Sequence, residues 1–257
     1  MTTKIPRILI TNDDGIESEG LKLLNGIAKS ISNDVWVIAP DKERSGASHS
    51  VSITAPIRTK KISEKQYSTS GSPVDCVILG VWEIMKNNPP DVILSGINNG
   101  ANLADDLAYS GTFAAAMEGA LLGFRSIALS QVRQLDKKAN FEPSEEYGQK
   151  IIKKLLSIKS WPNNSFFNVN FPSPDNGDLK GHKFTQQGKR PPGSFSVDRR
   201  IDPRNNEYFW IKLSYPPSDP KLETDLKCID DNYISITPVT SDFTSYTWKR
   251  AIKEFKS

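Results

Sequence analysis

Residues 7–15, Arg7-Ile8-Leu9-Ile10-Thr11-Asn12-Asp13-Asp14-Gly15, place a short apolar run directly before two acids. The apolar run predicts a buried strand over Ile8–Thr11. The polar residues and the glycine that follow predict a tight turn at the carboxyl end of that strand. In a parallel sheet this is the end where ligands bind, so the two acids are the first candidates for a functional site.

The first half of the chain repeats this alternation of strand and helix. Further buried strands are predicted over Val35–Ala39, Val92–Ser95 and Ile127–Ser130. Helical patterns begin at Ser18 and cover residues 73–86, Thr112–Leu122 and Ser144–Ile158. Strands that alternate with helices predict an α/β fold, with a mostly parallel sheet and helices on both faces.

The helix predicted over residues 73–86 has the clearest boundaries. Ser72 is expected to be its N-cap and Pro73 its first residue, and Asp75 lies in its first turn. Apolar residues recur at spacings of three and four, at Val74, Val77, Ile78, Val81, Trp82 and Met85.

The second half of the chain has a different pattern. Residues 161–223 contain many of the 17 prolines. Strand-like runs replace the helices over Phe166–Phe171, His182–Thr185, Tyr208–Leu213 and Tyr233–Thr237. We interpret residues 1–160 as the α/β core and residues 161–257 as an antiparallel or hairpin-rich extension; a single domain over 1–257 is the alternative. The basic segment Gly188–Arg204 is either a solvated loop, or a lid or oligomer arm.

Composition narrows the class of protein. The 33 basic and 30 acidic residues leave a net charge of only +3, which argues against a nucleic-acid polymer as partner. No apolar run approaches the roughly 20 residues that cross a bilayer, and no signal-peptide pattern opens the chain. Cys76 and Cys228 form no CxxC motif, and Cys76 is expected to be a buried thiol. We therefore expect a cytoplasmic protein with no membrane partner.

Polar clusters follow the predicted strands. Three come directly after a strand and the fourth opens a helix: Asn12–Gly15, Asp41–Gly46, Ser95–Asn102 and Tyr109–Thr112. Because ligands gather beyond the carboxyl ends of parallel strands, we expect these clusters to form one site.

Asp13 and Asp14 are candidate ligands of a divalent metal. Two adjacent carboxylates repel each other unless a cation lies beside them, and oxygen ligands suit Mg²⁺, Mn²⁺ or Ca²⁺. Ser45 offers a hydroxyl and Asn98 a neutral amide oxygen as further ligands. The alternatives are local: an acidic turn or cap before the helix from Ser18, and ordinary turn residues at 45 and 98.

The stretch Ser110-Gly111-Thr112 precedes an alanine-rich helix, where free amides and the positive end of the helix dipole favour an anion. A plain N-cap is the alternative for this stretch. Asn102 is a further candidate donor to a phosphate. Asp105 and Asp106 are interpreted as capping or salt-bridge residues rather than ligands.

Other catalytic classes lack their motifs. The chain has only two histidines and no spaced His/Asp cluster for zinc. A GxSxG elbow, a P-loop GxxxxGK motif and a GxGxxG motif are all absent.

The ordered set of motifs resembles the SurE family, survival nucleotidases that act on 5′- and 3′-nucleotides. The resemblance spans nearly the whole chain, and each piece alone is modest. The matching runs are 10–15, 39–41 with 44–48, Gly71–Val77, Ser95–Asn98 with Asn102-Leu103, Tyr109–Gly119, 202–204 with 208–210, and 233–238.

This resemblance implies a Rossmann-like core over 1–160, with a β-hairpin extension and a swapped C-terminal oligomerisation element within 161–257. It implies a homodimer or homotetramer. Residues 241–256 carry the aromatic residues of that C-terminal helix. From the sequence alone, docking on its own subunit is the alternative to exchange between subunits.

The resemblance also implies a site and a reaction. Asp13, Asp14, Ser45 and Asn98 would hold one Mg²⁺ or Mn²⁺ ion per subunit, and Asn102 and the stretch Ser110-Gly111-Thr112 would contact phosphate. The two acids are then the catalytic candidates, and hydrolysis of a mononucleotide by activated water is the expected reaction. One of the two acids acting as the base on that water is the alternative.

One departure from the family leaves the acid for the leaving group unassigned. Some members carry a histidine shortly after the Thr-Pro strand, where this chain reads Asp242-Phe243-Thr244-Ser245-Tyr246. Tyr246 is the candidate for that place.

Two rival functions stay open on the sequence. An aspartyl-phosphate phosphatase needs Asp-x-Asp after its first strand, but Asn12 stands two residues before Asp14. A nucleotide sensor without catalysis would use the same binding residues and release no phosphate.

Overall fold

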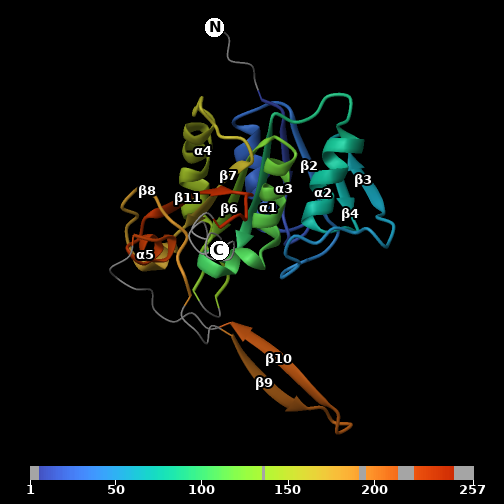
Figure 1. Cartoon of the computed structure of the whole chain (residues 1–257), viewed down its shortest axis with the longest axis vertical. Helices are drawn as coiled ribbons and strands as arrows, with labels where there is room; N and C mark the ends of the chain where they lie inside the picture. Colours follow the sequence, from blue (N-terminus) through green and yellow to red (C-terminus); the bar gives the residue numbers. More distant parts are fainter. Residues whose placement is uncertain (1–5, 135–136, 191–194, 214–222, 246–257) are drawn as a thin grey trace, which may run out of the picture.

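The computed structural model describes residues 6–134, 137–190, 195–213 and 223–245. These residues form one large sheet flanked by helices, and a two-stranded ribbon that projects from this body (Figure 1). The strands are β1 Ile8–Thr11, β2 Val35–Pro40, β3 Thr59–Ser63, β4 Gln66–Thr69, β5 Val92–Asn99, β6 Arg125–Gln131, β7 Ser165–Phe171, β8 His182–Phe184, β9 Phe195–Ile201, β10 Glu207–Leu213 and β11 Ile234–Thr240. The α-helices are α1 Glu19–Lys29, α2 Pro73–Leu79, α3 Gly111–Leu121, α4 Glu142–Leu156 and α5 Asp225–Asp230. A π-helical turn η1 covers Gly80–Ile84, and 3₁₀ turns cover Ala104–Ala108 (η2) and Pro174–Asn176 (η3).

The large sheet has the strand order β3-β4-β2-β1-β5-β6-β7-β11-β8. Every neighbouring pair from β4 to β7 is parallel, whereas β3–β4 and β7–β11 are antiparallel and β11–β8 is parallel. From β1 the chain moves to β2 on one side, and it later adds β5 on the other. The strand order therefore reverses between β1 and β5, which is where such sheets bind ligands. The predicted α/β class with a mostly parallel sheet is confirmed.

Helices cover both faces of the sheet, as predicted. Ile8 and Ile10 of β1 belong to the core cluster that contains the apolar residues of α1 and α4. Leu9 belongs to the opposite cluster, with residues of α2 and α3. All three side chains are fully buried. This two-sided burial explains why the strand is a continuous apolar run rather than an alternating one.

The boundaries of α2 confirm its predicted start but not its predicted length. Ser72 is the N-cap and forms a capping box with Asp75. The α-helix ends at Leu79 and continues as η1, in which the Met85 amide donates to the Gly80 carbonyl at 2.8 Å. The wider turn rotates the side chains that follow, and Trp82, predicted on the apolar face, is 65% exposed.

The second half of the chain contributes to both sheets. Strands β7, β11 and β8 extend the large sheet, so the sheet crosses the predicted division at residue 160. Strands β9 and β10 form an antiparallel hairpin, as predicted for the extension. The division into 1–160 and 161–257 stays a prediction. The described start of the predicted C-terminal helix, residues 241–245, is not helical, so the prediction is wrong there. Tyr246 and the residues after it lie outside the described residues.

Two further predictions concern cysteines and membranes. Cys76 and Cys228 are both buried free thiols, which confirms the prediction for Cys76. Among the described ranges, no helix combines the length and the apolar character that a bilayer crossing requires.

Candidate active site

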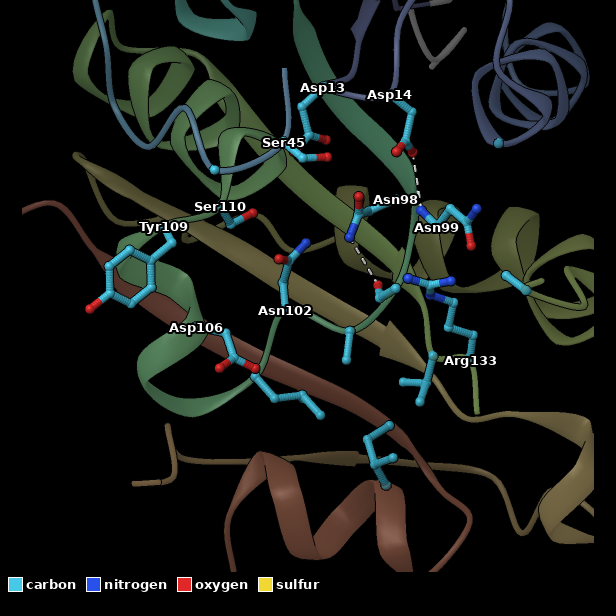
Figure 2. A pocket seen from close by; sticks show the side chains of 18 of the residues that line it. Asp13, Asp14, Ser45, Asn98, Asn99, Asn102, Asp106, Tyr109, Ser110 and Arg133 are labelled. Atoms are coloured by element: carbon cyan, nitrogen blue, oxygen red, sulfur yellow. Dashed lines mark hydrogen bonds between the residues drawn. The ribbon is translucent and has the colours of Figure 1, made fainter. Parts of the chain in front are cut away.

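A cavity of about 1220 Å³ opens at the carboxyl ends of β1, β2, β5 and β6, beside the point where the strand order reverses. Residues from all four predicted polar clusters line it, and Figure 2 shows their side chains pointing toward one another. The predicted site residues along its wall are Asp13, Asp14, Ser45, Asn98, Asn102 and Ser110.

The turn after β1 directs both acids into the cavity. Asn12 Nδ2 donates to the Gly15 carbonyl at 3.0 Å and to Ser18 Oγ at 2.7 Å. Ser18 is the N-cap of α1. The two acids therefore do not cap this helix, which was their local alternative.

Asp13 is buried against the first turn of α3. Both the hydroxyl and the amide of Thr112 donate to its carboxylate. Gly111 permits this approach, because a Cβ there would lie 2.9 Å from the Asp13 Cβ. Burial raises the pKa of Asp13 above its usual value, although the hydrogen bonds from Thr112 act in the opposite direction. The N-terminus of α3 thus already contacts the Asp13 carboxyl group, whose charged form the helix dipole favours.

The predicted phosphate contacts of Gly111 and Thr112 stay predictions. Neither residue is among those that line the cavity, and the Thr112 side chain is fully buried. The sequence indicated an anion site at this helix start, and the structure places the Asp13 carboxyl group there. Ser110 does line the cavity and caps α3, with its Oγ accepting from the Phe113 amide at 3.0 Å. Its N-cap role is confirmed, and its contact with phosphate stays a prediction.

Asp14 contacts the end of β5, whereas Asp13 contacts α3. Its Oδ2 accepts from the Asn99 amide at 3.1 Å (Figure 2). Burial, followed by the charge of Asp13, raises the pKa of Asp14 to about 6, against the opposing effects of that amide and of Arg133. Within the described ranges, no lysine or arginine forms an ion pair with either acid.

Asn98 reaches the cavity because β5 is interrupted before it. The register of β5 with β6 shifts between Ser95 and Asn98. Gly96 makes this possible, since its φ is +136° and a Cβ would lie 2.3 Å from the Leu129 carbonyl oxygen. Beyond the shift, Asn98 Nδ2 donates to the Gly100 carbonyl at 3.0 Å. Its amide oxygen is left facing the two acids (Figure 2).

Ser45 enters the cavity on the loop after β2. Its Oγ donates to Glu43 Oε1 at 2.7 Å. Two contacts hold this loop on the α3 side of the molecule. Ser48 Oγ donates to a carbonyl oxygen of η2 at 2.7 Å, and His49 Nε2 lies 2.8 Å from Glu118 Oε2. The loop therefore presents Ser45 beside Asp13 (Figure 2).

The four predicted ligands fit a hard divalent cation. They offer two carboxylates, one amide oxygen and one hydroxyl, which is the donor set that Mg²⁺ and Mn²⁺ accept. The described part of the chain contains no group of three or more His, Cys, Asp and Glu side chains that would form a metal site of another kind. The charge of the buried Asp13 raises the pKa of the half-buried Asp14, and a cation between the two carboxylates would offset their repulsion. Metal binding itself stays a prediction.

Asn102 is fixed by amide side chains from the neighbouring strands. Asn170 of β7 binds both backbone groups of Asn102, accepting from its N–H and donating to its carbonyl, each at 2.9 Å. Asn168, also on β7, donates to the same carbonyl at 2.9 Å. The Asn102 side chain donates to Ser130 Oγ of β6 at 2.8 Å. These bonds hold Asn102 in one orientation at the cavity wall.

Sequence reasoning assigned no role to several other residues of the cavity wall. These are Tyr109, Arg133, Arg190 and Phe195. Arg190 Nη2 lies 2.6 Å from Asp106 Oδ2, which confirms the salt-bridge interpretation of Asp106. The sequence feature that could have indicated Arg190 and Phe195 was the basic segment Gly188–Arg204. No pattern within that segment shows which acid Arg190 contacts.

The sequence pattern of the family described as Survival protein SurE matches residues 8–193. This range is most of the chain and contains every predicted site residue. The chain belongs to the SurE family. The structure is also similar to the crystal structure of the SurE protein from Aquifex aeolicus, with a TM-score of 0.82 and 37% identity, covering 98% of this chain and 100% of that one.

Curated relatives within the SurE family extend the similarity to nearly full length. The 5′-nucleotidase SurE of Parvibaculum lavamentivorans is 45% identical over 254 residues, covering 98% of this chain and 91% of the relative. The 5′-nucleotidase SurE of Hyphomonas neptunium is 43% identical over 250 residues, covering 96% of this chain and 98% of the relative.

Proposed function

We propose that this protein is a 5′-nucleotidase that hydrolyses nucleoside 5′-monophosphates to nucleoside and phosphate. The observation that carries the proposal is the convergence of Asp13, Asp14 and Asn98 in one cavity at the reversal of strand order. The relatives named 5′-nucleotidase SurE support the same reaction class.

One divalent ion, Mg²⁺ or Mn²⁺, is proposed to be held by Asp13, Asp14, Ser45 and Asn98. When bound, such an ion supplies positive charge beside phosphoryl oxygens and makes water more acidic. The protein would contribute the geometry. The contacts of Thr112 with Asp13 and of Asn99 with Asp14 orient the two carboxylates, and the bond from Asn98 to Gly100 orients the amide oxygen.

Asn102 and Ser110 are proposed to contact the phosphate on the wall opposite Asp14. Both residues line the cavity, and both are fixed by hydrogen bonds before a ligand arrives. Preorganised polar groups of this kind stabilise charge that develops on the phosphoryl oxygens. In the reaction, water adds to phosphorus as the bond to the ribose oxygen breaks, and the nucleoside leaves with a hydroxyl group.

Residue 12 argues against the aspartyl-phosphate alternative. That mechanism needs a carboxylate nucleophile two residues before Asp14, but Asn12 stands there and its side chain is hydrogen-bonded to Gly15 and Ser18. The other alternative, a nucleotide sensor, would differ from the enzyme only because it hydrolyses nothing. This alternative predicts nucleotide binding in the presence of metal without release of phosphate.

The decisive experiment is a phosphate-release assay on the full chain. Substrates are 5′-AMP, 3′-AMP and ribose 5-phosphate, each with Mg²⁺, with Mn²⁺ or with EDTA. We expect release from 5′-AMP that depends on the metal, and release from 3′-AMP would extend the activity to that class. Full activity after exhaustive chelation would refute the metal requirement. Binding of 5′-AMP without release would support the sensor.

A homodimer or homotetramer with exchanged C-terminal segments is proposed as the assembly. The hairpin supports association, because Phe209, Trp210 and Ile211 are each more than half exposed on the isolated chain. Light scattering of the full chain and of a chain lacking residues 241–257 tests this. A truncated chain that keeps both its fold and its subunit number would exclude exchange through that segment.

A further inference from the structure

Two aromatic rings stand on the wall of an otherwise polar cavity. Tyr109 is 52% exposed and Phe195 is 47% exposed, and both line the same cavity as the acid pair. Their ring centroids lie 5.4 Å apart with an interplanar angle of 77°, an edge-to-face contact. Large apolar side chains left half in solvent beside a polar site are typical of surfaces that a ligand covers.

Tyr109 is placed close to the predicted phosphate contacts. It directly precedes Ser110, and Figure 2 shows its ring on the side of the cavity where Ser110 and Asn102 lie, away from Asp14. Its backbone is fixed on both sides: its amide donates to the Asp106 carbonyl at 3.0 Å, and its carbonyl accepts from the Ser48 amide at 3.2 Å. The ring therefore stands at a defined position beside the phosphate end of the cavity.

Phe195 is distant from Tyr109 in the sequence. Arg190, which precedes Phe195 by five residues, forms an ion pair on the same wall of the cavity. Arg190 forms a two-pronged contact with Asp106, at 3.3 Å from Nε and 2.6 Å from Nη2. The side chains of this pair are only 8% and 15% exposed. The Arg190 amide also donates to Asp105 Oδ2 at 2.6 Å. Arg190 is thereby fixed to η2, the turn that leads into Tyr109.

We propose that Tyr109 and Phe195 form the subsite for the nucleobase of the substrate, which stacks on the face of one ring and packs against the nearly perpendicular second ring while its phosphate lies at Asn102 and Ser110. This inference rests on the proposed function, because it takes a mononucleotide as the ligand. Aromatic rings bind bases through the ring face, which every base has, so the subsite recognises a base without requiring a particular hydrogen-bonding edge. Arg190 and Asp106 pair with each other on the same wall of the cavity, and the proposal assigns them no contact with the base.

The test compares two substrates that differ only by the base, 5′-AMP and ribose 5-phosphate. Tyr109→Ala and Phe195→Ala are expected to lower kcat/KM for 5′-AMP by about tenfold, mainly through KM, because stacking of one base on an aromatic ring contributes to binding by roughly this factor. The loss on ribose 5-phosphate should be several-fold smaller. Tyr109→Phe and Phe195→Tyr keep an aromatic ring and should retain most of the preference for 5′-AMP.

The matched control is Trp82→Ala, which removes an exposed aromatic side chain that does not line the cavity. Equal losses on the two substrates would overturn the proposal, because they would place the effect at the phosphate site. Equal losses for Trp82→Ala and Phe195→Ala would also overturn it. If the unaltered protein releases no phosphate from 5′-AMP, the proposed function itself is wrong. If it releases phosphate, but the ratio of kcat/KM for 5′-AMP to that for ribose 5-phosphate is the same in the variants, only the proposed base subsite is wrong.

Discussion

The acids at the two ends of the parallel strands lie in opposite environments. We call the amino-terminal end of the strands the amino edge of the sheet and the carboxyl-terminal end the carboxyl edge. At the amino edge, Asp34 precedes β2 and receives hydrogen bonds from Lys65 at 2.8 Å, Arg7 at 2.6 Å and Trp36 at 3.0 Å. Burial opposes its ionisation, but these donors outweigh that effect and lower the pKa of Asp34 to about 2. At the carboxyl edge, the pKa values of Asp13 and Asp14 are raised.

This difference in pKa indicates a different role for the acids at each edge. The chain supplies its own cations to Asp34, so this acid is satisfied within the folded protein and contributes to stability. Asp13 and Asp14 receive neutral donors, from Thr112 and from the Asn99 amide. A cation from outside the chain would therefore balance the charge of the acid pair, which is the arrangement expected of a cation site.

The largest effect is expected for Asp14→Asn. We predict that kcat for 5′-AMP falls by about 10²–10³-fold, on the scale of losing one key electrostatic group. The fold should persist, because the new amide oxygen can still accept from the Asn99 amide. Asp34→Asn is the control at the opposite edge and should keep kcat within about twofold. Equal losses in the two variants would remove the functional distinction between the edges.

A metal-induced gain in stability is the next effect in size. At a concentration of Mn²⁺ 100 times its dissociation constant, binding to the native state alone should add about 2.7 kcal/mol to the free energy of unfolding. Thermal unfolding of the unaltered protein and of Asp34→Asn should shift upward together, whereas Asp14→Asn should shift much less. An undiminished shift in Asp14→Asn would place the metal elsewhere.

Thr112→Val tests the contact between α3 and the acid pair. The variant keeps the shape of the side chain but leaves the buried Asp13 without one donor, which should cost about 1.5–3 kcal/mol of stability without metal. Thr112→Ser retains the hydroxyl and should recover most of this loss. Urea unfolding curves measure both, and a valine variant as stable as the serine variant would show that the hydrogen bond contributes nothing.

The amide network at Asn102 should have a smaller effect. Ser130→Ala frees the Asn102 side chain while leaving its backbone contacts in place, and we expect kcat/KM to fall by about fivefold, a coupling of typical size. In an Asn102→Ala background the same substitution should have almost no further effect. If the two losses add in full, Ser130 acts by a route other than Asn102.

The smallest effect concerns the pH dependence of Asp34. Its pKa in the folded state, about 2, lies below the ordinary value of 3.8. Its contribution is therefore complete above about pH 4 and is lost as the pH falls toward 2. Because water reaches this cluster, we expect Asp34→Asn to cost only about 0.5–1 kcal/mol at neutral pH. The gap between the unfolding curves of the two proteins should narrow between pH 4 and pH 3, and a constant gap would contradict an ionic contribution.

Much of this arrangement could be predicted from local sequence. Apolar runs gave the strands at the centre of the sheet, and the Ser72–Asp75 signal gave the start of α2, because both depend on nearby residues. The polar clusters after the strands led to Asp13, Asp14, Ser45 and Asn98. The structure brings all four to one cavity, since parallel strands end at a common edge.

The features that escaped prediction depend on partners distant in the chain. Thr112 donates to Asp13, and Asn170 binds Asn102, across separations of 99 and 68 residues. The ribbon's Phe195 meets Tyr109 in the same way. No local pattern distinguishes a threonine that binds phosphate from one that binds an acid, because both stand at the start of a helix.

The hydrogen bonds from Asn168 and Asn170 to the backbone of Asn102 also have a consequence for protein synthesis. Asp13, Asp14, Ser45 and Asn98 have all left the ribosome well before β7 is made, but Asn102 acquires its backbone partners only when Asn168 and Asn170 emerge. A nascent chain that ends before these residues has the acid side of the cavity and lacks the restraint on the other side. The restraint on Asn102 is therefore added late during translation, by two asparagines of a strand that takes no direct part in the proposed reaction.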